Sequence, residues 1–75
     1  MKDAIEIFVA ERVKEKRIEK GYSQLKLAIE LEVSSGFIGM VESNRYMHKY
    51  SLTQLNKIAK LFECSPRDFL PENPL

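Results

Sequence analysis

Cysteine, histidine and tryptophan are nearly missing from this 75-residue chain, which has one cysteine, one histidine and no tryptophan. A single cysteine cannot form an internal disulfide, and with one histidine it cannot complete a Cys/His zinc site. We also find no nucleophile paired with a base and no phosphate-binding loop. The sequence therefore predicts no metal, no cofactor and no small-molecule ligand, and we do not expect an enzyme.

Long apolar runs and a charge excess of one sign are absent too. The opening residues, MKDAIEIF, lack the apolar stretch of a signal peptide, and no run could span a membrane. The 12 basic and 11 acidic residues leave a formal net charge of +1, which is far from the excess of an obvious nucleic-acid binder. We therefore expect a cytoplasmic chain without a membrane partner, in which any basic surface must come from local clustering.

The residues that are present indicate one small globular domain built of helices. Hydrophobic residues make up 44% of the chain, which suits a folded domain better than a disordered segment. Ser23, Ser34, Ser51 and Ser65 are typical N-caps, and Gly21 suits a left-handed C-cap. With no alternating run long enough for a strand, we predict an all-α fold of five short helices. These cover Ala4–Lys20, Gln24–Leu31, Ser35–Ser43, residues 52–62 and a brief helix between Ser65 and Pro71.

Helical spacing identifies the core-facing stripes of the first and fourth helices. The stripe of the first helix ends on a charged residue, Arg17, and Glu42 likewise lies one turn beyond Ile38 in the third helix. The stripes consist of Ile5, Val9 and Val13 in the first helix, and Leu52, Leu55, Ile58, Ala59 and Phe62 in the fourth.

The second and third helices, joined by a very tight turn, form a helix-turn-helix pattern. Ser23 to Ala28, SQLKLA, resembles the S-Q-x-x-L-A signature of the Xre family of lambda-repressor and Cro-like domains. The similarity continues through Val33-Ser34, Ile38 and Val41-Glu42 to Asp68-Phe69-Leu70, and it covers roughly Val9 to Leu70.

This resemblance implies a compact five-helix lambda-repressor-like bundle over residues 1–70, with 71–75 as a C-terminal tail. It also implies a transcriptional regulator of repressor, Cro or controller type that binds double-stranded DNA as a homodimer on a palindromic operator. The recognition helix, about Ser35–Ser43, would lie in the major groove. The DNA-binding candidates are Ser23, Gln24, Ser34, Ser35, Gly36, Phe37, Gly39, Met40, Asn44, Arg45 and Lys49.

The family often pairs a basic residue near the end of the first helix with the glutamate ending the third. Arg17 and Glu42 match those positions, and we expect a partly buried structural ion pair. The alternative is that both are unrelated, solvated charges.

The third helix departs from a typical recognition helix because it displays no Arg, Gln or Asn toward base edges. Specific binding would then depend on Gln24, the serines and DNA shape, and the alternative is weak, backbone-driven binding. Leu25 and Ile29, with Phe37 and Met40, suggest a second function: an antitoxin-like or adaptor module whose apolar surface on the second and third helices binds a protein partner. Glu32 stands where the family usually has a glycine.

Overall fold

A computed structural model describes residues 2–75. The regular elements among these residues are all helices, with no strand. The all-α prediction is confirmed. The fifth element is a short 3-10 turn rather than an α-helix, and the first and third helices each end one residue earlier than expected. The elements are α1 (Ala4–Glu19), α2 (Gln24–Leu31), α3 (Ser35–Glu42), α4 (Leu52–Phe62) and η1 (Pro66–Phe69).

Each element is preceded by an N-cap residue whose side chain accepts a hydrogen bond from a backbone N–H of the first turn. Asp3 caps α1, and Ser23, Ser34, Ser51 and Ser65 cap the four later elements. Such caps satisfy donors that have no partner within the helix. The start of every element is therefore encoded locally, which explains why the sequence predicts these positions well.

The ends of α1, α2 and α4 are followed by a residue with left-handed backbone. Gly21 follows α1 with φ of 76°, as its lack of a side chain allows. Glu32 and Glu63, the C-caps of α2 and α4, adopt φ of 58° and 55° although neither is glycine. The turn between α2 and α3 therefore keeps the left-handed geometry that usually requires glycine, at some cost in strain.

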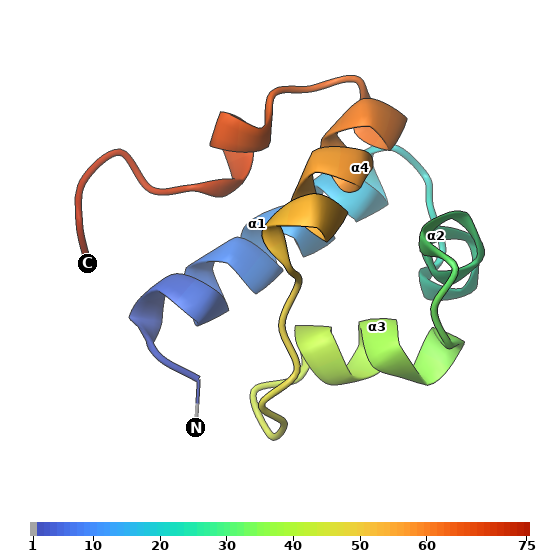
Figure 1. Ribbon diagram of the computed structural model, residues 1–75, viewed down its shortest axis with the longest axis horizontal. Helices are drawn as coiled ribbons and strands as arrows, with labels where there is room; N and C mark the ends of the chain where they lie inside the picture. Colours follow the sequence, from blue (N-terminus) through green and yellow to red (C-terminus); the bar gives the residue numbers. More distant parts are fainter. Residues whose placement is uncertain (1) are drawn as a thin grey trace.

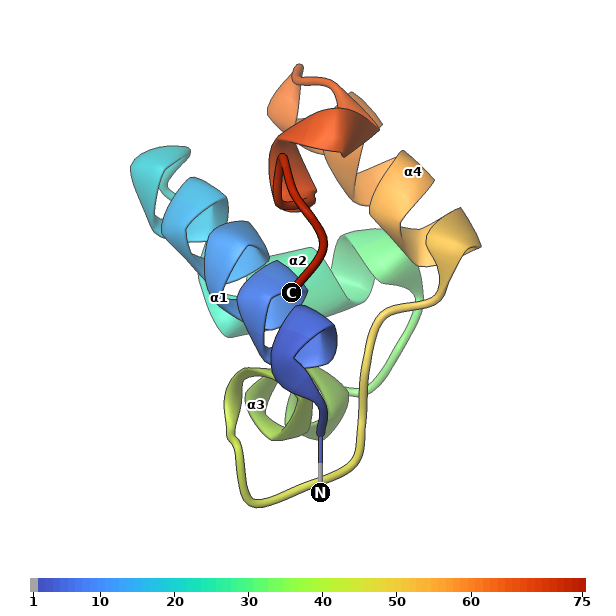
Figure 2. The same ribbon diagram turned by 90° about the vertical axis from the view of Figure 1, so that its left-hand side faces the viewer.

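A single core joins the elements, and α2 packs mainly against α3. Figures 1 and 2 show α2 and α3 at one side of α1 and α4, with the C-terminal segment at the other. No helix in residues 2–75 combines the length and apolar character needed to cross a membrane. The largest fully buried side chains are Val13, Leu27, Ile38, Val41, Ile58, Phe62 and Phe69.

Two of the expected core positions are wrong. Leu52 is 82% exposed, and Ile5 is also exposed. Both lie in the first turns of their helices, where they border an apolar pocket of about 150 Å³ between α1, α4 and Leu70. Because this pocket is open, the first residue of each stripe contacts solvent, whereas the later residues reach the closed core.

Candidate nucleic-acid interface

The α2–turn–α3 unit presents two capped helix N-termini. Ser23 Oγ accepts a hydrogen bond from the Lys26 N–H at 3.0 Å, and Ser34 Oγ accepts one from the Phe37 N–H at 3.2 Å. The other free N–H groups of each first turn, together with the helix dipole, favour a negatively charged group. Small serine caps leave room for such a group to approach.

The outer face of α3 is shallow because it carries little side chain. Ser35 and Gly36 are exposed, and Gly39 and Met40 are partly exposed. The Met40 Cε atom lies 3.8 Å from where a Cβ on Gly36 would be, so the methionine extends along the helix over that glycine. A flat partner could therefore approach the α3 backbone closely at Gly39, with the flexible Met40 side chain beside it.

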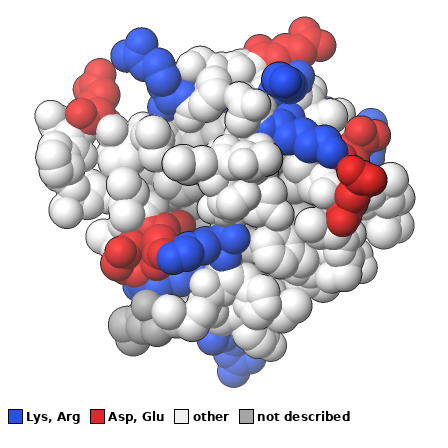
Figure 3. Space-filling view, viewed as in Figure 1, with Lys and Arg blue, Asp and Glu red and all other residues white. Residues whose placement is uncertain are grey.

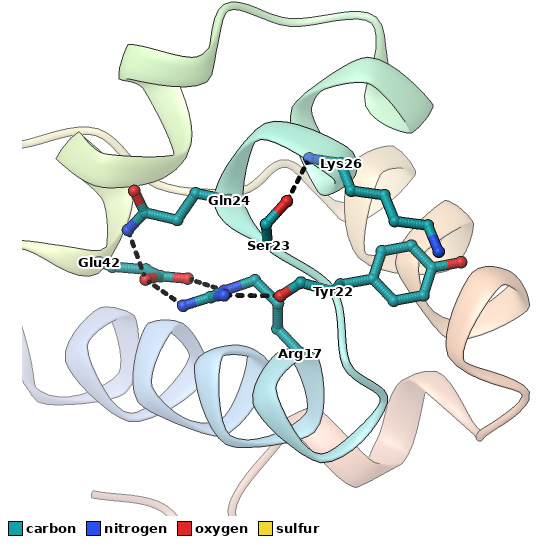
Figure 4. A network of polar contacts seen from close by, with 6 residues as sticks. All are labelled: Arg17, Tyr22, Ser23, Gln24, Lys26 and Glu42. Carbon is teal, nitrogen blue, oxygen red and sulfur yellow. Dashed lines mark hydrogen bonds and ion pairs between the residues drawn. The ribbon is translucent and has the colours of Figure 1, made fainter.

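A buried polar network holds α3 against α1 (Figure 4). The Arg17 guanidinium donates from Nε to Glu42 Oε2 at 2.7 Å and from Nη2 to Oε1 at 3.1 Å, and its Nη1 donates to the Tyr22 carbonyl at 2.7 Å. The exposed fractions of the Arg17 and Glu42 side chains are only 10% and 4%. The two residues expected to pair therefore form a bidentate ion pair, the geometry that guanidinium and carboxylate favour.

Gln24 belongs to the same network and faces α3 (Figure 4). Its Nε2 donates to Glu42 Oε1 at 3.0 Å. A carboxylate can only accept, so this bond fixes the orientation of the amide. The free Oε1 lies 3.7 Å from where a Cβ on Gly39 would be. The start of α2 thus places an acceptor oxygen beside the glycine at the centre of α3.

The segment after α3 carries an exposed cation. Asn44 and Arg45 are exposed, and the Arg45 N–H donates to Ser43 Oγ at 3.3 Å. Figure 3 shows that the opposite charges are interspersed on the face viewed, with no large cluster of one sign. The exposed cation after α3 is therefore the single residue Arg45, not part of a broad basic patch on the face viewed.

Two of the expected DNA contacts, Lys49 and Phe37, have partners outside the α2–turn–α3 unit. Lys49 Nζ forms an ion pair with Glu6, which lowers the pKa of Glu6 through that hydrogen bond and raises the pKa of Lys49. Phe37 is partly buried and makes edge-to-face contacts with the rings of His48 and Tyr50, with centroids 5.9 and 6.1 Å apart. In this structure both side chains therefore contact residues outside α2 and α3.

Lys2 also belongs to this site, although no sequence pattern indicates a role for it. Its ammonium group donates to backbone carbonyls at the end of α3, although Lys2 and these residues are 38 to 41 positions apart. No local pattern signals a contact at that separation. Lys2 is therefore a component of this site that only the three-dimensional structure could provide.

Two other polar side chains, Tyr50 and Cys64, are shielded from solvent to different degrees. Tyr50 is buried with its hydroxyl unpartnered, and this burial raises its pKa. Cys64 is half-buried, and desolvation raises the pKa of its thiol. Within residues 2–75, no group of three or more His, Cys, Asp and Glu side chains is placed to hold a metal ion.

Leu25 and Ile29 form an apolar pair on α2, and their exposed fractions are 59% and 65%.

Comparison with solved structures identifies proteins that share this fold. The restriction-modification controller protein C.AhdI from Aeromonas hydrophila shares 29% identity with a TM-score of 0.72, over 87% of this chain and 96% of that one. The biofilm master regulator SinR, solved in complex with DNA, shares 28% identity with a TM-score of 0.68, over 81% of this chain and 95% of its own. A structure of the SinR–SinI complex shares 28% identity with a TM-score of 0.69, and the match covers 85% of this chain and 61% of the chain in that structure.

An enzyme also contains this fold. Hydroxypropylphosphonic acid epoxidase from S. wedmorenis has a TM-score of 0.79 at 24% identity, over 93% of this chain but only 36% of the enzyme. At that identity the likeness concerns the fold of one segment and carries no activity. A comparison with curated proteins found no significant match.

The comparison with family models gives the assignment. The helix-turn-helix model matches residues 13–69, a range that includes α2, the turn, α3 and α4. The chain therefore belongs to the helix-turn-helix family, in its Xre-like group.

Proposed function

We propose that this chain is a sequence-specific DNA-binding regulator of transcription, with α3 in the major groove. The observation that carries the proposal is the open face of α3. Gly39 leaves its backbone accessible beside the free oxygen of Gln24, and the exposed Gly36 is bordered by the flexible Met40 side chain. The solved complex of the related SinR with DNA supports the same use of this fold.

Within this proposal, positioning and base readout are separate tasks. The N-termini of α2 and α3, capped by Ser23 and Ser34, bind phosphates, and Asn44 and Arg45 bind phosphates beyond the end of α3. Base edges are read by Gln24, Ser35 and the backbone near the glycines, and Met40 contacts thymine methyl groups. We give Phe37 and Lys49 structural roles, because their partners, His48, Tyr50 and Glu6, lie outside the α2–turn–α3 unit.

We further propose that two copies bind a palindromic operator as a two-fold dimer. The apolar pocket bordered by Ile5, Leu52 and Leu70 is a suitable contact, since these exposed side chains surround a largely apolar hollow. Leu52→Asp should leave the fold intact, because Leu52 is 82% exposed, and should yield a monomer in sedimentation equilibrium. A variant that sediments like the wild type would place the contact elsewhere.

The decisive experiment is a titration of fluorescent genomic DNA fragments, including the region upstream of the gene itself, at two salt concentrations. A sequence-specific regulator should bind one fragment at least about a hundredfold more tightly than the others, a threshold set below the usual specificity ratios of roughly 10³–10⁷. Its affinity should fall as salt rises. Uniformly weak binding that vanishes at physiological salt would contradict the proposal.

A second candidate function is a protein-interaction module of antitoxin or adaptor type. The exposed pair Leu25 and Ile29 favours it, as does the solved complex of SinR with SinI. In a pull-down, a partner that binds the wild type and is lost from Leu25→Asp/Ile29→Asp would support this function. If the same variant instead lost DNA binding and lost no protein partner, Leu25 and Ile29 would belong to the DNA interface.

A further inference from the structure

Lys2 reaches from the start of the chain to the C-terminal end of α3. Figures 1 and 2 both show the N-terminal segment beside α3 and the loop that follows it. The Lys2 Nζ atom donates to the carbonyl oxygens of Ser43 at 3.0 Å and Met40 at 3.4 Å, and to that of Val41. An ammonium group has three donors, and these three carbonyls take all of them.

The end of α3 has few other means of satisfying its carbonyls. Ser43, the C-cap, is extended, with φ of −99° and ψ of 133°, and α3 has no basic residue in its last turn. The Ser43 N–H donates only to the Met40 carbonyl, at 3.3 Å. Helix C-termini leave several carbonyls unpaired and carry partial negative charge. Lys2 therefore supplies both the donors and the positive charge that α3 lacks.

The position of the ammonium group separates it from any ligand. Lys2 is only 4% exposed, and burial lowers its pKa while the nearby Glu6 carboxylate raises it. A side chain so enclosed by protein carbonyls cannot also contact a phosphate on the open face of α3. Its effect on a DNA complex would thus be exerted through the backbone that it holds.

That backbone leads directly to the expected phosphate contacts. Ser43 is followed by Asn44 and Arg45, and the Arg45 N–H is bonded to Ser43 Oγ. By bonding the carbonyls of Val41 and Ser43, Lys2 fixes the direction in which the chain leaves α3. The same contacts hold the last turn of α3, which includes Met40.

We propose that Lys2 is a positioning residue for DNA recognition: it fixes the end of α3 and the start of the following loop, without touching DNA. The inference rests on the proposed DNA-binding function. It assigns to the N-terminal segment, outside the helix-turn-helix unit, a part in how tightly that unit binds its site.

The test compares Lys2→Met with wild type and with Lys60→Met. Lys60 is an exposed residue on α4, so its substitution removes the same charge without a contact to α3. DNA affinity is measured on the tightest fragment at several salt concentrations. Lys2→Met should bind about tenfold more weakly than wild type, the size expected for losing a charge at a helix end. Lys60→Met should bind like wild type.

The slope of log affinity against log salt separates positioning from direct contact. Each phosphate contact contributes about −0.9 to that slope. Lys2→Met should keep the wild-type slope, and a slope shallower by about one would overturn the proposal by making Lys2 a phosphate ligand. Wild-type affinity in Lys2→Met would overturn it as well.

Amide hydrogen exchange tests the structural half in the same samples. Exchange at Ser43 and Arg45 should be faster in Lys2→Met and unchanged in Lys60→Met, and equal rates in all three proteins would overturn the proposal. If Lys2→Met does not fold, Lys2→Gln, which keeps a hydrogen-bond donor, replaces it under the same criteria. If wild type binds no fragment, the proposed function and this inference fail together; if wild type binds and Lys2→Met matches it, the inference alone fails.

Discussion

Arg17 and Glu42 form a bidentate ion pair, with Nε 2.7 Å from Oε2, that joins the last turn of α1 to the last residue of α3. Both side chains are almost completely buried. Glu42 also accepts the hydrogen bond from Gln24, so one carboxylate links α1, α2 and α3. The orientation of α3, and with it the geometry of the proposed DNA face, depends on this contact.

Arg17→Met should lower the free energy of unfolding by about 3–5 kcal/mol, because it leaves the Glu42 carboxylate buried without its cation. Urea denaturation followed by circular dichroism measures the loss. Arg17→Met/Glu42→Leu should recover much of the stability, since neither charge then remains buried. Lys49→Met removes a cation that is itself largely exposed in its pair with Glu6, and a loss in Arg17→Met no larger than in that control would contradict the prediction.

Gly39→Ala should make the protein more stable and bind DNA more weakly. A Cβ at this position would meet only Gln24 Oε1, at 3.7 Å, which is ordinary contact. Alanine in place of a helix-interior glycine contributes up to about 1 kcal/mol. The same methyl group would stand on the proposed DNA face and prevent close approach of the backbone.

The matched control is Asn56→Ala on the exposed side of α4, where alanine also favours the helix. Thermal denaturation should show a gain for both variants, and DNA titration a loss for Gly39→Ala alone. Undiminished DNA affinity in Gly39→Ala would exclude the centre of α3 from the interface.

Arg45→Ala should weaken DNA binding by a similar factor on every fragment, because a phosphate contact carries no sequence information. The slope of log affinity against log salt should become shallower by about one. Lys57→Ala, on the exposed side of α4, should change neither quantity. A loss confined to the preferred fragment would instead make Arg45 a reader of bases.

The features that the sequence predicts well are the local ones. Ser23 and Ser34 cap helices through residues three positions away, and the tight turn between α2 and α3 follows from those two starts. The pairing of Arg17 with Glu42 spans 25 residues, yet helical periodicity and the family pattern both indicate these positions.

The contacts that could not be predicted from the sequence join residues that are far apart along the chain and lie at its start or on its surface. Lys2 bonds carbonyls 38 to 41 positions away, and Lys49 pairs with Glu6 across 43 positions. Neither contact follows from periodicity or capping. Leu52 has the spacing of a core residue, but its place in the first turn of α4 leaves it beside an open pocket. Such contacts require knowledge of which chain segments meet.

Glu32→Gly should stabilise the protein, because Glu32 adopts φ of 58° at the end of α2, where side chains cost about 1 kcal/mol. The greater freedom of glycine in the unfolded chain offsets part of this gain. The Glu32 carboxylate lies 3.6 Å from Lys57 Nζ in an exposed pair, which contributes little. We therefore expect a net gain of about 0.5 kcal/mol in urea denaturation.

Glu30→Gly is the matched control, since it removes an exposed glutamate from α2 two residues earlier, where the backbone is helical. This change should destabilise the protein by about 1 kcal/mol, the usual cost of glycine within a helix. The two substitutions remove the same charge from the same helix, so opposite signs isolate the backbone effect. If both variants were destabilised, the left-handed turn would not be the source of strain, and a direct contact of Glu32 would have to account for its presence.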